Sequence, residues 1–241
     1  VKSVVRKCDG VEHIWQADSA VWGYHAPILF PHAGKLVDGT LHAKGKDYAS
    51  GQHGFARLME HDLVKQTATT LVMELRSNPE TLANFPYEFR LISTFTLEGD
   101  ALHHTLTVVN QDSDVLPFGI GYHPAFAIPF DSEHTATDYE LRFNKMESPL
   151  CLSCQPNGLL RGKFYYLGTN IDRIPIDDKL FEIDSHCMAN LNSSTLGLYE
   201  KDTGRGVECT IAGFPYVLLW SKPGMPKFVC IEPWHSLPSL E

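Results

Sequence analysis

Two short apolar stretches, more than a hundred residues apart, each lead to an ionisable side chain that is followed by proline. The first stretch contains His123-Pro124, and the second contains Glu232-Pro233. Because proline has no N–H to donate to a β-ladder, each pattern predicts a buried strand that ends at the charged residue. We therefore expect His123 and Glu232 at the rim of a sheet, on either side of a small ligand, as general acid and general base.

Both residues also have a purely structural interpretation, and spacing alone leaves it open. A histidine at a sheet rim is often hydrogen-bonded to the backbone of a corner, and spacing slightly favours that role for His123. Glu232 could form a salt bridge with one of the few arginines. A carboxylate between an apolar run and Pro233-Trp234 is nevertheless expected to be partly desolvated, which costs free energy unless it is paired.

Further polar residues could contribute to a site at the same place. His53 and Arg57 stand four residues apart in the glycine-punctuated segment Gly51–Arg57, which lacks the phosphate-loop pattern. The alternative is a turn with an exposed imidazole and a guanidinium on a neighbouring carboxylate. Asp177 and Asp178 could simply begin a helical turn, where carboxylates suit the free N–H groups.

The remaining motifs exclude several kinds of chemistry. No nucleophile elbow, Ser-His-Asp order or metal signature is present, and Cys151–Cys154 is the one CxxC pair. A structural zinc site needs two further ligands at workable spacing, and no second pair exists. The four tryptophans are more often core residues, although an indole at a sheet rim can stack on the apolar face of a sugar. We expect proton transfer without a metal or cofactor.

Composition narrows the partners and the compartment. The chain has 241 residues and a net charge of −9, which argues against nucleic acid as a partner. No apolar run approaches the roughly 20 residues of a membrane span, and no signal-peptide pattern opens the chain. Six cysteines are too few for a disulfide scaffold, so reduced thiols in a cytoplasmic protein are expected. Val1–Val5 already has the pattern of a strand and lacks methionine, which suggests that an upstream piece is missing.

Period-two alternation predicts an all-β fold. Tyr87–Leu97 places its apolar residues on one face and its polar residues on the other, as in a half-buried antiparallel strand. Gly99-Asp100 turns this strand into Ala101–Asn110, which alternates in the same way. No stretch of fifteen residues keeps a helical period, and no internal repeat is found. We predict a single domain over residues 1–241 with a large two-sheet antiparallel β-sandwich; a propeller or jelly roll is the alternative.

Other segments give weaker signals. Strands are predicted at His61–Lys65, Thr70–Arg76 and Tyr139–Asn144, a single helical turn at Asn78–Asn84, and a turn at Gln155–Gly158.

Four short motifs follow one another along the chain: Ala26–Pro31, His53–Arg57, Gly121–Phe126 and Ile231–Trp234. Taken together and in this order, they resemble the aldose 1-epimerase (galactose mutarotase) family, most closely its LacX-like bacterial branch. Each motif alone is weak, whereas four in the right order are specific, and the resemblance covers nearly the whole chain. It implies a galactose mutarotase-like β-supersandwich whose first strand normally begins before Val1.

The resemblance also implies roles for individual residues. His123 corresponds to the family's general acid, Glu232 to its general base and His53 to its second active-site histidine. Asp177, in Ile174–Asp177, is the equivalent of the sugar-binding aspartate. Lys35 stands where relatives often have arginine, so Arg57 could share the cationic contact with the sugar.

The implied function is mutarotation of a hexose, without cofactor, by a monomer or weak homodimer. Glu232 would take the proton of the anomeric hydroxyl while protonated His123 donates to the ring oxygen, which requires an ionised glutamate and a histidine with a pKa near or above neutral. Two alternatives remain: a hexose-6-phosphate mutarotase, for which only Lys35 and Arg57 could bind phosphate, and a carbohydrate-binding or sensing protein without turnover.

Overall fold

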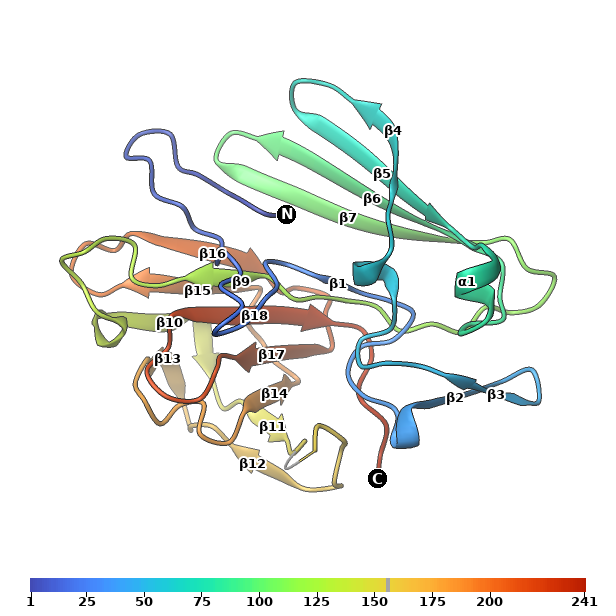
Figure 1. Ribbon diagram of the computed structural model, residues 1–241. Coiled ribbons are helices and arrows are strands. Elements are labelled where there is room, and N and C mark those ends of the chain that lie inside the picture. The colour runs from blue at the N-terminus through green and yellow to red at the C-terminus, as the bar shows by residue number, and fades with distance from the viewer. Residues whose placement is uncertain (155–156) are drawn as a thin grey trace.

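The computed structural model describes residues 1–154 and 157–241, and most of its regular structure is β-strand (Figure 1). The strands are β1 (Ile28–Leu29), β2 (Thr40–Ala43), β3 (Lys46–Ala49), β4 (Asp62–Gln66), β5 (Thr70–Arg76), β6 (Phe89–Glu98), β7 (Ala101–Asn110), β8 (Gly121–Tyr122), β9 (Ala125–Ala127), β10 (Tyr139–Glu147), β11 (Leu150–Leu152), β12 (Phe164–Tyr166), β13 (Ile171–Pro175), β14 (Ser185–Ala189), β15 (Thr195–Glu200), β16 (Gly206–Thr210), β17 (Tyr216–Trp220) and β18 (Phe228–Trp234). The short helices are α1 (Pro79–Leu82) and the 3₁₀ turns η1 (Val37–Gly39), η2 (Ala56–Leu58) and η3 (Ala136–Asp138).

Two antiparallel sheets pack face to face and enclose the largest hydrophobic core. An eight-stranded sheet has the order β1-β8-β18-β17-β14-β11-β12, with β9 also paired to β18, and a four-stranded sheet has the order β13-β10-β15-β16. Residues such as Leu141 on β10, Leu198 on β15 and Ile231 on β18 meet in this core. Alternate residues of a strand point to opposite faces, so each sheet has one face in the core. The predicted β-sandwich is confirmed.

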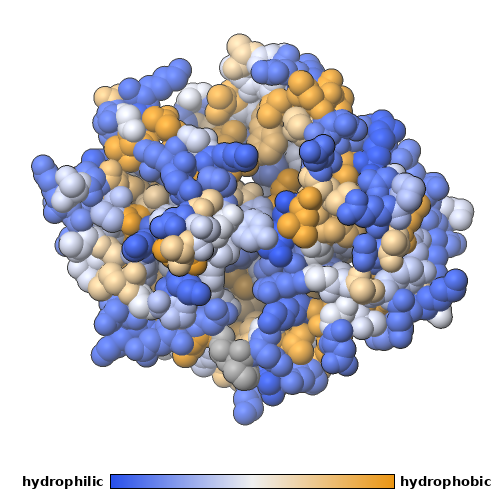
Figure 2. Space-filling view, in the orientation of Figure 1, coloured by the Kyte–Doolittle hydropathy of each residue, from blue (hydrophilic) through white to orange (hydrophobic). Residues whose placement is uncertain are grey.

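A third sheet, with the order β4-β5-β6-β7, lies above the sandwich in the view of Figure 1. Its strands follow one another in antiparallel hairpins, and β6 pairs with β7 from Phe89–Asn110 to Glu98–Ala101. Phe89 and Leu91 are buried in a second, largely aromatic core. The far ends of the hairpins are exposed, and Figure 2 shows apolar side chains on the surface over this sheet.

Most of the strands expected from the sequence are present. β5 and β7 have the predicted bounds, and β6 begins and ends within two residues of the predicted strand. The predicted helical turn is α1; Asn78 caps it by accepting a hydrogen bond from the Thr81 N–H at 3.0 Å. The turn predicted at Gln155–Gly158 lies partly outside the described residues.

The prediction of a strand at the start of the chain is wrong. Val5 forms only an isolated bridge with Glu12, and Ile14 forms another with Phe126. A β-branched segment needs a partner strand along its length, and this segment finds one at single residues only. No helix within residues 1–154 and 157–241 is long and apolar enough to cross a membrane.

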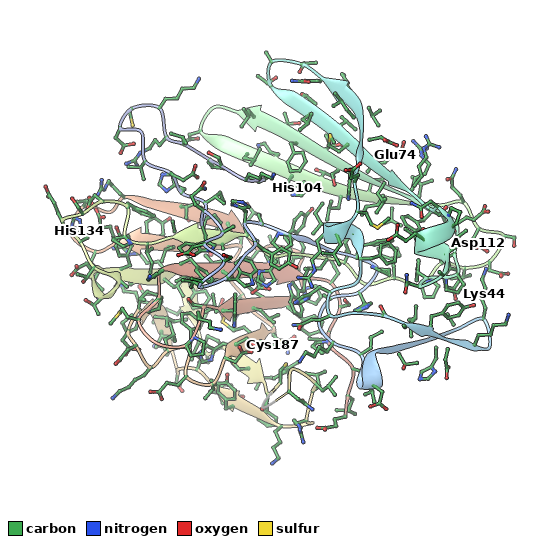
Figure 3. The ribbon with its side chains drawn as sticks, in the orientation of Figure 1. Lys44, Glu74, His104, Asp112, His134 and Cys187 are labelled. Atoms are coloured by element: carbon green, nitrogen blue, oxygen red, sulfur yellow. The ribbon has the colours of Figure 1, made fainter. Side chains whose placement is uncertain are left out.

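A network of ionic side chains joins strands at one end of the sandwich, where Figure 3 labels His134. Arg205 donates to both carboxylate oxygens of the buried Glu200 at 2.8 Å and also pairs with Asp131. Nδ1 of His134 lies 2.7 Å from Asp131. The hydrogen bonds to Asp131 and Asp202 raise the pKa of His134 to about 9.

This network predicts that the protein loses stability in alkaline solution. The pKa of His134 in the folded protein is above its value of about 6.5 in the unfolded chain. The contribution of His134 to the free energy of unfolding is therefore complete below pH 6.5 and is lost as the pH rises through about 9. We expect the urea midpoint to fall between pH 6.5 and 9.5 in the natural protein and to fall less in His134→Gln. Equal losses in the two proteins would show that other groups cause the change.

Candidate active site

The outer face of the eight-stranded sheet carries the candidate catalytic carboxylate. On β18, Val229 and Ile231 point into the sandwich core, whereas Phe228, Cys230 and Trp234 belong to clusters on the opposite face. Glu232 shares that opposite face because side chains alternate along a strand. Only 1% of its surface is exposed. Glu232 therefore lies away from the main core and is still almost completely desolvated.

The position of Glu232 within the sheet differs from the prediction. β18 continues through Pro233, which is paired with Val217, and ends at Trp234, so Glu232 lies inside a central strand and not at its end. Proline is tolerated here because the neighbouring strand on the other side of β18 is interrupted. β9 pairs with Phe228–Cys230 and β8 with Trp234, which leaves residues 231–233 facing a gap.

The same gap positions His123. Residues 123–124 connect β8 to β9, so they pass opposite residues 231–233 of β18. Pro124 cannot continue the ladder, which explains why the strand breaks at this point. Nε2 of His123 lies 3.3 Å from Oε2 of Glu232. Two residues separated by more than a hundred positions are thus brought together in one place, in direct contact.

The pair is nevertheless arranged differently from the expectation of a ligand between acid and base. A separation of 3.3 Å leaves no space for a sugar ring between the two side chains. His123 and Glu232 lie side by side, so they can serve two neighbouring oxygens of one ligand from the same side. An acetal carbon offers such neighbouring oxygens.

Aromatic rings surround the imidazole of His123. The indole of Trp22 is stacked on it with ring centroids 5.0 Å apart, and Trp220 meets it edge-on at 5.8 Å. His53 completes this environment at 5.5 Å, with its ring nearly perpendicular to that of His123. These contacts fix the plane of the imidazole and direct Nε2 towards Glu232.

Burial opposes charge on either member of the pair. It raises the pKa of Glu232 well above the usual range, and the nearby negative charge of Asp184 raises it further. It also lowers the pKa of His123 to about 3. Between these limits the pair holds one proton, and burial favours that proton on the carboxyl group. The expectation of a histidine charged near neutral pH is therefore wrong for the site without a ligand.

His53 is held in an unusual backbone conformation next to the pair. Its φ of 66° lies in the left-handed region, which non-glycine residues rarely adopt. Its Nδ1 accepts a hydrogen bond from the Gly34 N–H at 3.0 Å, so the remaining ring proton is on Nε2, which lies 3.1 Å from the side-chain amide of Gln52. At Gly54 a Cβ would clash with the carbonyl oxygen of Phe30, which makes glycine necessary there. The structure thus places a neutral histidine donor beside His123.

The two cationic candidates are already engaged by the protein. Arg57 lies over the ring of Tyr24 at 4.8 Å and donates to the carbonyl oxygen of Gln52 at 3.0 Å. Its buried Nε has no partner among the described residues, and its positive charge contributes to the lowered pKa values of His53 and His123. Lys35 donates to the carbonyl oxygen of Asn157 at 2.8 Å.

Asp177, the aspartate selected from the sequence, caps a turn, and a second aspartate acts on Glu232. Oδ1 of Asp177 accepts hydrogen bonds from the N–H groups of Lys179 and Leu180, as in the alternative of a helical turn. Asp184, seven residues later, accepts from the indole N–H of Trp220 at 2.9 Å and acts electrostatically on Glu232. Its backbone φ is 74°. The sequence carries no motif that distinguishes Asp184 from the other aspartates, so sequence reasoning missed it.

The CxxC cysteines do not converge on one site. Cys151 is buried in the sandwich core, whereas Cys154 belongs to the cluster on the outer face of the sheet, together with Cys187, which is labelled on β14 in Figure 3. Among residues 1–154 and 157–241, the groups of side chains that could hold a metal ion include neither of these two cysteines.

The sequence matches a family model and a known protein over nearly its whole length. Residues 2–241 match the family model described as aldose 1-epimerase. The chromosomal protein LacX of Lactococcus lactis subsp. lactis is 31% identical over 242 residues, which cover 97% of this chain and 81% of LacX.

Solved structures show the same fold. A galactose mutarotase related enzyme from Lactobacillus acidophilus superposes with a TM-score of 0.94 at 28% identity, over 100% of this chain and 80% of that one. A galactose mutarotase-like protein from Lactobacillus casei ATCC 334 gives a TM-score of 0.91 at 30% identity, over 100% and 83% of the two chains.

Proposed function

Because the chain belongs to the aldose 1-epimerase family, we propose that it is a mutarotase that interconverts the α and β anomers of a hexose without a cofactor. The observation that carries this proposal is the buried contact between His123 and Glu232, whose Nε2 and Oε2 atoms lie 3.3 Å apart. Opening a hemiacetal ring requires one proton acceptor at the anomeric hydroxyl and one proton donor at the ring oxygen, and the pair supplies both.

The reaction follows from this arrangement in three steps. The proton of the pair moves to Nε2 of His123 when a sugar binds, because the anomeric hydroxyl then donates to the Glu232 carboxylate and the ring oxygen accepts from the imidazolium. Glu232 removes the hydroxyl proton as His123 protonates the ring oxygen, and the C1–O5 bond breaks. The open aldehyde rotates about C1–C2, and the ring closes with the proton transfers reversed.

Neighbouring residues have supporting roles in this proposal. His53 donates from Nε2 to a sugar hydroxyl in place of its contact with the Gln52 side chain. Arg57 donates in the same way from Nε, which has no acceptor among the described residues. Lys35 is the third polar group contributed by the segments that precede β4, although its ammonium already binds a backbone carbonyl. Trp22 covers the face of His123 and excludes water from the proton transfer.

Polarimetry tests the function. Freshly dissolved α-glucose and α-galactose should reach their equilibrium rotation faster in proportion to the added protein, beyond the spontaneous rate. Glucose 6-phosphate, measured in parallel, tests whether a phosphorylated hexose is preferred. A protein that binds sugars in calorimetry and accelerates none of them is a binding protein, and this result would reject the proposal.

The assignment of the sugar-binding aspartate can be tested with a matched pair of variants. We expect Asp184→Asn to raise KM and to lower kcat/KM by about tenfold, because the charge near Glu232 changes and one acceptor for a sugar hydroxyl is weakened. Asp177→Asn should reduce stability slightly by weakening a turn cap and should leave both kinetic constants unchanged. The reverse result would return the sugar contact to Asp177.

A further inference from the structure

Cys230 lies beside the candidate catalytic pair and has no part in the proposed proton transfer. It precedes Glu232 by two residues on β18, so both side chains are on the outer face of the sheet. A ring nitrogen of His123, Sγ of Cys230 and a carboxylate oxygen of Glu232 all lie within 4.8 Å of one another, and the three residues are buried. Imidazole, thiolate and carboxylate are the three side-chain groups that bind zinc in proteins.

The separation of two of these atoms fits a tetrahedral ion. Zinc is bound by nitrogen and oxygen at about 2.0–2.1 Å, so two such ligands at a tetrahedral angle lie about 3.3 Å apart. The distance from Nε2 of His123 to Oε2 of Glu232 is 3.3 Å. Sulfur binds zinc at about 2.3 Å, and Sγ of Cys230 lies within 4.8 Å of both atoms.

A second observation points to a missing positive partner. Oε2 of Glu232 is buried and forms no hydrogen bond within the described part of the chain. The structure contains another cluster of this kind, formed by Asp131, His134 and Glu200, but Arg205 already supplies its positive charge. The carboxylates of that cluster are thus paired with an arginine. Among residues 1–154 and 157–241, no lysine or arginine forms an ion pair with Glu232, whose one such contact is with His123.

Charge balance also favours an ion with two positive charges. A thiolate and a carboxylate carry two negative charges, and a neutral histidine adds none, so a divalent ion makes the buried group neutral.

We propose that His123, Cys230 and Glu232 form a binding site for a thiophilic divalent ion such as Zn²⁺, which occupies the positions that the sugar oxygens need and so inhibits the reaction. The binding site stands on its own geometry, and only the inhibition rests on the proposed function. The ion is an inhibitor in this proposal and not a cofactor. His123 retains 7% of its surface exposed, so one member of the site still reaches solvent.

Cobalt absorption tests the site without reference to activity. Co²⁺ added to the purified, metal-free protein should produce a thiolate-to-cobalt charge-transfer band in the near ultraviolet, together with the visible bands of tetrahedral Co²⁺. Zn²⁺ should abolish both. The charge-transfer band should be absent in Cys230→Ser, and Glu232→Gln should bind cobalt at least tenfold more weakly than the natural protein. Circular dichroism confirms that each variant is folded.

Two variants serve as controls for binding elsewhere. Cys8→Ser removes an exposed thiol, and His134→Gln alters the other histidine–carboxylate cluster. Both should keep the full cobalt spectrum. A band that persists in Cys230→Ser, or that disappears in Cys8→Ser, would overturn the assignment. So would the absence of a band in the natural protein at millimolar Co²⁺.

Inhibition is measured separately by polarimetry. Zn²⁺ should lower kcat/KM in the natural protein by at least tenfold, competitively with sugar. In Cys230→Ser, kcat/KM should be nearly the same with and without zinc. Zinc that binds by the cobalt competition assay without slowing mutarotation would reject the inhibition. A protein without mutarotase activity would reject the proposed function, and the cobalt spectrum would still decide the site.

Discussion

Replacement of Glu232 by glutamine is expected to lower the catalysed rate of anomer interconversion by about 10²–10⁴-fold, the usual contribution of a positioned general base. Glutamine has the shape of the carboxylic acid but cannot accept the proton of the anomeric hydroxyl. The effect should appear in kcat and in kcat/KM equally, because the lost interaction exists only in the transition state. Polarimetry with a range of sugar concentrations measures both constants.

The same variant should be at least as stable as the natural protein. Burial holds the pKa of Glu232 well above its usual range, so an ionised Glu232 destabilises the fold and an uncharged amide does not. Glu147→Gln is the matched control, since Glu147 is also buried but accepts hydrogen bonds from the N–H groups of Asn192 and Ser193. That variant should lose stability and keep its activity per folded molecule. Unchanged turnover in Glu232→Gln would remove the residue from the mechanism.

Local patterns in the sequence were sufficient to predict the sandwich and its best strands. Period-two alternation located β6 and β7 because each buries one face only, and glycine-containing turns marked their ends. The N-terminal segment was mistaken for a strand because its β-branched residues favour extended backbone, whereas a strand also needs a neighbouring strand with which to pair. Pairing between distant segments is decided by tertiary contacts that no local pattern contains.

The candidate site was predicted only in part, because its geometry also depends on contacts between distant segments. Proline after an ionisable residue indicated two interruptions of a sheet, but only the register of β18 with β8 and β9 shows that both interruptions are one gap. Pro233 stays within its strand because it faces that gap, so Glu232 is buried in the sheet and not at its rim. This burial reverses the expected pKa directions. The sequence alone does not distinguish Asp184 from Asp177 as the aspartate that acts on Glu232. The structure does, because it shows Asp177 capping a turn and Asp184 raising the pKa of Glu232.

Replacement of His123 by asparagine is expected to lower kcat/KM by about 10²–10⁴-fold, because asparagine preserves a polar side chain but cannot transfer a proton to the ring oxygen. His186→Asn is the matched control. Its imidazole is also buried, but its two nitrogens contact Leu180 and Tyr165 within the protein. We expect this control to affect stability and not the rate per folded molecule.

The pH dependence of the natural protein separates this mechanism from one with an ordinary histidine. Because burial lowers the pKa of His123 to about 3 in the free enzyme, the pair keeps its single proton throughout mildly acidic solution. The profile of kcat/KM reports the free enzyme, so it should remain level from about pH 7 to about pH 5. A limb that falls with a midpoint near the ordinary histidine value of about 6.5, and that disappears in His123→Asn, would show that the imidazole titrates as if exposed. The desolvated contact with Glu232 would then not describe the working state of the enzyme.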